Sequence, residues 1–153
     1  MRGVAIVAAI FILVVLSALG AFIVSISTTQ QVGSTLDLQG VRAYQGARAG
    51  LEWGLYQAQA AGNCPGTLTV LSANATGSTN SFAPPSAASS LAGVTITVIC
   101  TKITDGNSGP TVYSLTATAC NQPLSGWSAS TVACPNTSNA TSLYVERQLT
   151  VSF

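Results

Sequence analysis

The sequence contains no histidine and few charged side chains. Five residues are basic and four are acidic, which gives a formal net charge of +1. Histidine is the commonest metal ligand and general base in proteins, so its absence disfavours metal-dependent and acid–base enzymes. Nucleic-acid binding is disfavoured as well, because neutralising phosphates requires a clustered lysine and arginine surface. We therefore expect no nucleic-acid partner, no cofactor and no metal ion.

Candidate catalytic groups are also scarce. The acids are scattered, and no two lie close enough in sequence to predict a carboxylate dyad: Asp37, Glu52, Asp105 and Glu146. Serine and threonine are abundant after the first third of the chain, but a hydroxyl nucleophile without a nearby histidine or lysine has no evident base. Lys102, the single lysine, sits beside a turn and is expected at the surface. The sequence thus predicts no enzyme and no catalytic residue.

The cysteines contain no CxxC pair, which makes a zinc or redox motif a poor interpretation. All four follow the first third of the chain: Cys64, Cys100, Cys120 and Cys134. An even count in a small exported domain favours two disulfides formed in an oxidising compartment over unpaired core cysteines. Four cysteines allow three pairings, and the sequence does not choose among them. We favour Cys120–Cys134, which closes a short loop between strands, and Cys64–Cys100, which ties a helix end to a sheet.

A long apolar run opens the chain. No charged residue occurs from position 3 to 36, and residues 4–26 (VAIVAAIFILVVLSALGAFIVSI) are mostly aliphatic. As a helix this run extends roughly 35 Å, enough for a bilayer core of about 30 Å. A cleaved secretory signal usually has an apolar region of about 7–15 residues, although residues 18–20 (ALG) resemble its small-x-small site. A simple single-pass membrane anchor is the other alternative, and the length of the run alone does not exclude it.

The residues before the run carry a further signal. Arg2 favours a cytoplasmic N-terminus. Gly3 has low helix propensity, but without a side chain it gives a protease close access to the backbone. Arg-Gly followed by a long aliphatic run resembles the type III signal of prepilins, which prepilin peptidase cuts after the glycine. That resemblance makes Gly3 the last leader residue and Val4 the first mature residue. Major pilins carry glutamate at the fifth mature position, where this chain has Ala8, so it resembles the minor, glutamate-lacking members.

The helical pattern continues beyond the apolar run. Apolar positions recur at mostly three- and four-residue intervals, as a core-facing stripe does: Val32, Leu36, Val41, Tyr44, Ala47, Leu51, Leu55 and Ala58. Arg48 and Glu52 have the spacing of a surface ion pair. The cluster at 62–66 (GNCPG) ends the helix, so residues 4–61 predict one helix of about 87 Å. Glycines at 20, 33, 40, 46, 50 and 54 indicate close packing against neighbouring helices or a flexible stretch near residues 25–34.

The remaining residues read as a small β domain. Residues 94–102 and 111–120 alternate apolar and polar positions around a turn cluster at 105–110, which predicts a hairpin. A last strand places alternate residues 145–153 on one face, where Arg147 is a misfit that suits the sheet rim. Residues 67–71 predict an edge strand and residues 72–90 a loop. Disulfides and the helix are expected to supplement the small core.

The two tryptophans and one short sequence pattern need separate interpretations. Trp53 is expected in the core against the sheet, and Trp127, in the 120–134 loop, is either exposed or packed. The pattern Asn-x-Ser/Thr begins at Asn74, Asn136 and Asn139. It matches a glycosylation acceptor, but chance in an Asn/Thr-rich chain is the preferred explanation.

Several segments together resemble one family. They are GVRAYQGARAGLEWGLYQA (40–58), AIFILVVL (9–16), TATACNQP (116–123), ACPN (133–136) and YVERQLTV (144–151). In this order they resemble the MSHA pilus biogenesis protein family MshP, over most of the chain except 67–90. The resemblance implies a minor or accessory pilin of a type IV pilus in a Gram-negative bacterium. Its expected partners are other pilins and minor pilins, prepilin peptidase and the inner membrane.

The expected fold class is α+β and pilin-like, with a long N-terminal helix packed on a small antiparallel sheet. Residues 1–3 form a leader, 4–27 a transmembrane or filament-core helix, 28–62 its continuation and 63–153 a disulfide-bonded β head. The head is expected in the periplasm, on a single-pass inner-membrane anchor, and later on the pilus. The leading hypothesis is a subunit for assembly or initiation at the filament tip. The alternatives are a tip adhesin whose 121–142 loop binds a surface ligand, and a minor pseudopilin of a type II secretion system.

Overall fold

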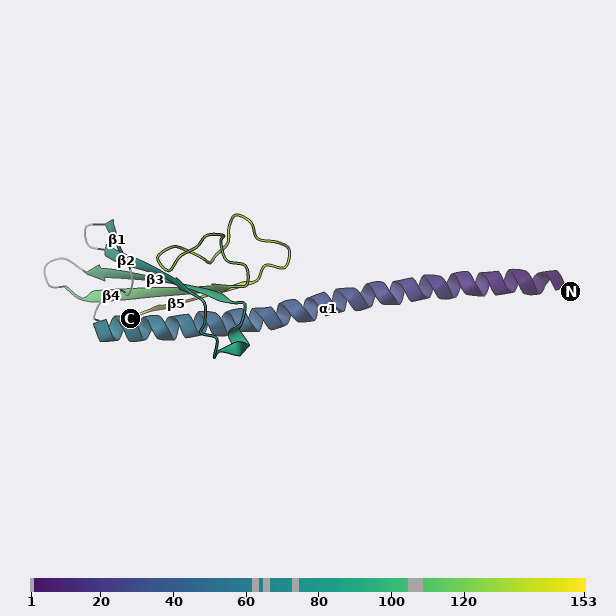
Figure 1. The fold of residues 1–153 in the computed structure, drawn as a ribbon, viewed down its shortest axis with the longest axis horizontal. Coiled ribbons are helices and arrows are strands. Elements are labelled where there is room, and N and C mark those ends of the chain that lie inside the picture. Colours follow the sequence, from purple (N-terminus) through teal and green to yellow (C-terminus); the bar gives the residue numbers. More distant parts are fainter. Residues whose placement is uncertain (1, 62–63, 65–66, 73–74, 105–108) are drawn as a thin grey trace. The chain divides into compact units, whose positions relative to one another are not determined.

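The computed structural model describes residues 2–61, 64, 67–72, 75–104 and 109–153. At 2–5, 28–29, 61, 67–72 and 75–76 it describes the backbone alone. One long helix is followed by five strands and a short 3-10 helix (Figure 1). The chain divides into two compact units, residues 1–37 and residues 38–153.

Helix α1 (Arg2–Ala61) ends at the predicted residue and begins two residues before the predicted start at Val4. No proline occurs before position 65, so no backbone N–H is missing from the helical ladder. In the first unit α1 is the whole structure, and its described side chains from 6 to 27 are all exposed. In the second unit the remainder of α1 packs on the sheet. The observed α+β arrangement confirms the predicted fold class and is consistent with a pilin-like fold.

The sheet is an antiparallel meander in which neighbours in sequence are neighbours in space, in the order β1-β2-β3-β4-β5. Its strands are β1 (Thr67–Ser72), β2 (Ala75–Phe82), β3 (Thr95–Thr104), β4 (Thr111–Cys120) and β5 (Glu146–Ser152). The register places Cys100 opposite Leu115, and Leu115 opposite Val151. Such local pairing needs only short connections, but two connections are longer: residues 83–94 between β2 and β3, and residues 121–145 between β4 and β5.

The predicted loop at 72–90 is wrong, because strand β2 occupies its first half. Strand β2 has the sequence ATGSTNSF, without the alternation of apolar residues that marks a half-buried strand. It forms because its backbone pairs with β1 on one side and with β3 on the other. Phe82 adds an apolar contact, since its ring lies 5.2 Å from the ring of Trp53. The expected edge strand at 67–71 is confirmed as β1, and η1 (Ser89–Leu91) follows β2.

The core lies between α1 and the face of the sheet that α1 covers. The strands contribute alternate residues from β3 and β4: Ile96, Val98, Cys100, Leu115, Ala117 and Ala119. The helix contributes mainly small residues, with Ala43, Ala47 and Ala58 buried. Leu51, Trp53 and Leu55 pack at the margins of this core, which confirms the prediction for Trp53.

Three glycines of α1 form the line of closest approach between helix and sheet. A Cβ added to Gly50 would lie 2.7 Å from Ile96 Cγ2, and one added to Gly46 would lie 3.0 Å from Val94 Cγ1. A Cβ at Gly54 would lie 3.2 Å from Val98 Cγ1. These glycines therefore serve packing within the chain, whereas Gly20 and Gly33 have no atom within 4 Å of such a Cβ. The expected inward positions Val32, Val41 and Tyr44 are exposed instead.

Candidate functional site

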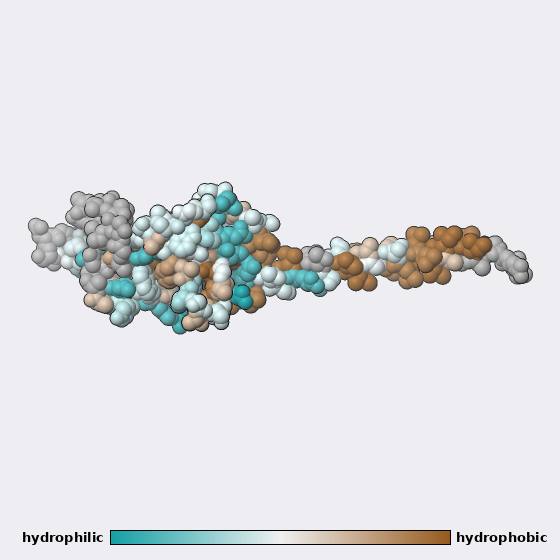
Figure 2. Space-filling view, viewed as in Figure 1, coloured by the Kyte–Doolittle hydropathy of each residue, from teal (hydrophilic) through white to brown (hydrophobic). Residues whose placement is uncertain are grey.

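The first candidate is the apolar surface of the N-terminal half of α1. Its large aliphatic and aromatic side chains are strongly exposed, with Phe11, Leu13 and Ile23 between 65% and 68% accessible. Figure 2 shows this segment in brown, in contrast to the white and teal of much of the head surface. A continuous apolar patch of this extent is not left in water. By length and composition α1 is able to cross a membrane. A signal sequence near an N-terminus meets the same two criteria.

The predicted processing site lies at the start of this helix. Gly3 and Val4 are both helical in backbone, and Ala8 is an exposed helical residue. The side chains at positions 3 and 4 lie outside the described part. Asp37, the first acid of the sequence, is exposed on α1. The fifth position after Gly3 thus carries an exposed methyl group and no carboxylate.

The second candidate is the segment between β4 and β5, which lies against the face of the sheet opposite α1 (Figure 1). The disulfide Cys120–Cys134 attaches it to the end of β4, with the two Cα atoms 5.8 Å apart. Both cysteines are fully buried. The favoured pairing is the one in the structure, because Cys64–Cys100 is the second disulfide. That second bond links the end of α1 to β3.

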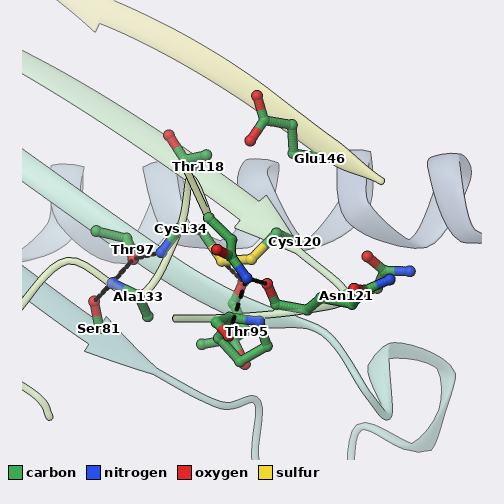
Figure 3. The surroundings of a disulfide bond; sticks show 12 residues. Ser81, Thr95, Thr97, Thr118, Cys120, Asn121, Ala133, Cys134 and Glu146 are labelled. Atoms are coloured by element: carbon green, nitrogen blue, oxygen red, sulfur yellow. Dashed lines mark hydrogen bonds between the residues drawn. A yellow bond between two sulfur atoms is a disulfide. The ribbon is translucent and has the colours of Figure 1, made fainter. Parts of the chain in front are cut away.

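Buried hydroxyl groups hold the same segment to the sheet, as Figure 3 shows. Thr97 Oγ1 accepts hydrogen bonds from the backbone N–H groups of Ala133 and Cys134, at 3.1 and 2.9 Å. Ser81 Oγ donates to the carbonyl of Thr131 at 2.6 Å and lies 2.8 Å from Thr97 Oγ1. These hydroxyls come from β2 and β3, so they satisfy backbone groups that the covalent bond brings into the interior.

Asn136 organises the second half of the segment. Its side-chain Nδ2 donates to the carbonyl of Gln122 at 2.9 Å, and its Oδ1 accepts from the N–H groups of Ser138 and Asn139. Its own backbone N–H donates to the hydroxyl of Tyr144 at 2.8 Å. Asn136 is buried, and its side-chain amide and backbone N–H all form hydrogen bonds within the protein. It is therefore a structural residue rather than a glycosylation acceptor. Asn139 is exposed, and Asn74 lies outside the described residues.

Tyr144 connects this segment to β5. Its hydroxyl donates to Glu146 Oε2 at 2.5 Å while accepting from the Asn136 N–H. Burial of the phenol, reinforced by the hydrogen bond to the Glu146 carboxylate, raises the pKa of Tyr144 to about 12. The neutral phenol is therefore the form that the fold stabilises.

The other predicted surface features lie as follows. Arg48 and Glu52 form the expected i,i+4 pair at 3.1 Å, with both side chains exposed. Arg147 is exposed on edge strand β5, so its rim position is confirmed, and a Cβ on Gly40 would lie 3.2 Å from its Nη2. Lys102 is half-buried, with Nζ 5.8 Å from the centre of the Tyr113 ring. Trp127 is half-buried as well.

An open groove of about 510 Å³ lies between the outer face of α1 and η1. It is lined by Gln45, Arg48, Ala49, Glu52, Ser90 and Leu91. Within the described residues, no group of three metal-ligating side chains comes together. The groove is open and of mixed polarity, and its two charged groups already pair with each other.

Sequence reasoning missed the residues that fix the loop. Nothing in the sequence marks Ser81, Thr97 or Asn136, because isolated hydroxyl and amide residues are common throughout this chain. The glycines at 46, 50 and 54 did carry a signal, since their spacing of four places them on one helical face. Comparison of the chain with family models, with curated proteins and with solved structures finds no match among them.

Proposed function

We propose that this protein is a minor, accessory type IV pilin of an MSHA-type pilus, acting in assembly or initiation at the filament tip. The observation that carries the proposal is a single helix, α1, with two different surfaces. Its first half exposes aliphatic side chains on all sides, and its second half is packed on a disulfide-bonded sheet. A chain built in this way has one segment for a bilayer or a helical bundle and one for water.

The assembly route follows from the N-terminal residues. Prepilin peptidase cuts between Gly3 and Val4 on the cytoplasmic side of the inner membrane. The head folds in the periplasm, where two disulfides form, and the subunit then joins other pilins and minor pilins in the filament. The apolar segment passes from lipid into the filament core without meeting water, which matches its complete lack of charged side chains from position 3 to 36.

The tip position follows from Ala8. A mature pilin carries a positive amine at its N-terminus, and an unpaired charge inside an apolar bundle is unfavourable. Shaft pilins compensate the amine of a neighbouring subunit with the glutamate at the fifth mature position. This chain offers no such carboxylate to a subunit above it, whereas its own amine can still meet a glutamate below. The position without a subunit above is the tip.

Quantitative proteomics of sheared pili tests this proposal. We expect a copy number far below that of the most abundant pilin, and a deletion strain with fewer pili of unchanged shaft structure. A copy number close to that of the major pilin would mean that the chain builds the shaft. A deletion that instead abolishes protein secretion while leaving pili intact would identify a minor pseudopilin of a type II secretion system.

A tip adhesin is the second candidate, and the 121–145 segment favours it. Its exposed residues are presented by a framework of one disulfide and buried hydrogen bonds, so they are preorganised for contact with a surface ligand. A purified head of residues 28–153 should then bind glycans or surfaces, and Trp127→Ala should weaken that binding. No binding by either protein would leave assembly as the sole role, and equal binding by both would show that Trp127 is not part of the contact.

A further inference from the structure

The turn of α1 around Gly33 has no tertiary support. Every residue from 30 to 35 is exposed, and a Cβ on Gly33 would meet no atom within 4 Å. Helices in proteins draw most of their stability from the packing of one face, and an unpacked stretch depends on intrinsic propensity alone. The stability of α1 at this turn is therefore set by the sequence of the turn itself.

That sequence is unfavourable for a helix. Gly33, Ser34 and Thr35 are three successive residues of low helix propensity. The Ser34 hydroxyl donates to the carbonyl of Gln30 at 3.1 Å, and the Thr35 hydroxyl donates to the carbonyl of Gln31 at 3.0 Å. These are the carbonyls that the backbone N–H groups of the same two residues use in an α-helix. Such back-bonding weakens the helical ladder and bends helices.

Both neighbouring stretches of α1 are better supported. The aliphatic run lies farther toward the N-terminus, at residues 4–26, and in lipid a helical backbone has no water with which to exchange its hydrogen bonds. After the turn, Ala43, Ala47 and Ala58 are buried against the sheet. The sequence boundary between the two compact units also falls next to this turn, between residues 37 and 38. This turn of α1 thus lies between two parts of the helix with different environments.

We propose that residues 30–37 form a joint, a segment where α1 opens locally while the helix on either side stays formed. The purpose of such a joint rests on the proposed function. A pilin must keep one helix in a flat bilayer and later in a curved filament, and a joint lets the head change direction between these two states. The opening itself is a property of the chain and is measurable without any pilus.

Hydrogen exchange of the full chain in lipid nanodiscs measures the opening directly. We expect amides 32–37 to exchange on the order of a hundred-fold faster than amides 46–56, which pack on the sheet, and faster than those of residues 8–24. Exchange at 32–37 as slow as at 46–56 would overturn the proposal. A wrong assignment to pili would leave this result unchanged, so the two failures are distinguishable.

The triple variant Gly33→Ala/Ser34→Ala/Thr35→Ala tests the cause. Alanine restores helix propensity and removes both back-bonding hydroxyls, so exchange at 32–37 should slow on the order of ten-fold or more. Gly20→Ala is the matched control, because its new Cβ also enters open space. It should leave exchange at 32–37 unchanged. Equal exchange in the triple variant and the wild type would show that these three residues do not make a joint.

Discussion

Gly50 is the residue at which helix and sheet are closest. Gly50→Ala adds a methyl group 2.7 Å from Ile96 Cγ2 and 3.2 Å from Ala117 Cβ, where all neighbours are buried. Overpacking of this kind costs about 1–3 kcal/mol, against a gain in helix propensity of about 1 kcal/mol. We expect a net loss in the free energy of unfolding of residues 28–153, measured in urea. Gly33→Ala, with open space around it, should be neutral or stabilising.

Because of Tyr144, the free energy of unfolding of the head should fall at alkaline pH. Its pKa rises from 10.0 to about 12 because the phenol is buried and bonded to Glu146. The raised value means that the fold favours the neutral phenol, so this contribution is complete below pH 10 and is lost as pH rises through 12. Since the group is partly solvated, we expect about 1–2 kcal/mol. In urea titrations of the head, Tyr144→Phe should lose less stability between pH 9 and 12 than the wild type.

At the scale of elements, the two disulfides stabilise different parts of the head. Cys120–Cys134 closes a short sequence interval of 14 and Cys64–Cys100 an interval of 36. Replacing either pair with serine should cost about 2–4 kcal/mol. Hydrogen exchange should separate them: losing the first pair exposes amides of 124–145, and losing the second frays the end of α1. The opposite pattern, or free thiols in peptide maps of the exported protein, would contradict this assignment.

How far the sequence predicts these elements depends on whether apolar spacing marks them. Strand β4 was predicted over its full range, because Leu115, Ala117 and Ala119 alternate with polar residues. Strand β2 was missed, because backbone pairing on both sides creates it and its residues are polar. The core face of α1 was placed partly wrong, because the sheet selects small residues and leaves Val41 and Tyr44 outside. Proximity in three dimensions decides such choices.

The candidate site was predicted to a similar extent. The apolar segment came from run length, and the presence of two disulfides came from the even cysteine count. The favoured pairs came from the expected strands and helix end around the cysteines. The hydrogen bonds of Ser81, Thr97 and Asn136 join residues far apart in the chain. Such long-range partners leave no local spacing, so the way in which the 121–145 segment is fixed needed the structure.

At the scale of the whole molecule, our proposal assigns the position in the filament to Ala8. Ala8→Glu supplies the carboxylate that a subunit above requires, so the copy number per pilus should rise several-fold toward that of a shaft pilin. Ala9→Glu is the matched control, because it places the same charge one position away, on another face of the helix. It should reduce incorporation. Equal copy numbers for the wild type and Ala8→Glu, counted by proteomics of sheared pili, would refute the role of Ala8.

The mature N-terminus is the most direct test that the chain is a pilin. Mass spectrometry of the protein from its native membrane should find a chain that begins at Val4, and Gly3→Ala should abolish this cleavage because the peptidase needs the bare backbone. A mature chain that begins within residues 20–23 would instead establish a secretory signal, remove the apolar segment from the mature protein and contradict the assignment to a pilus.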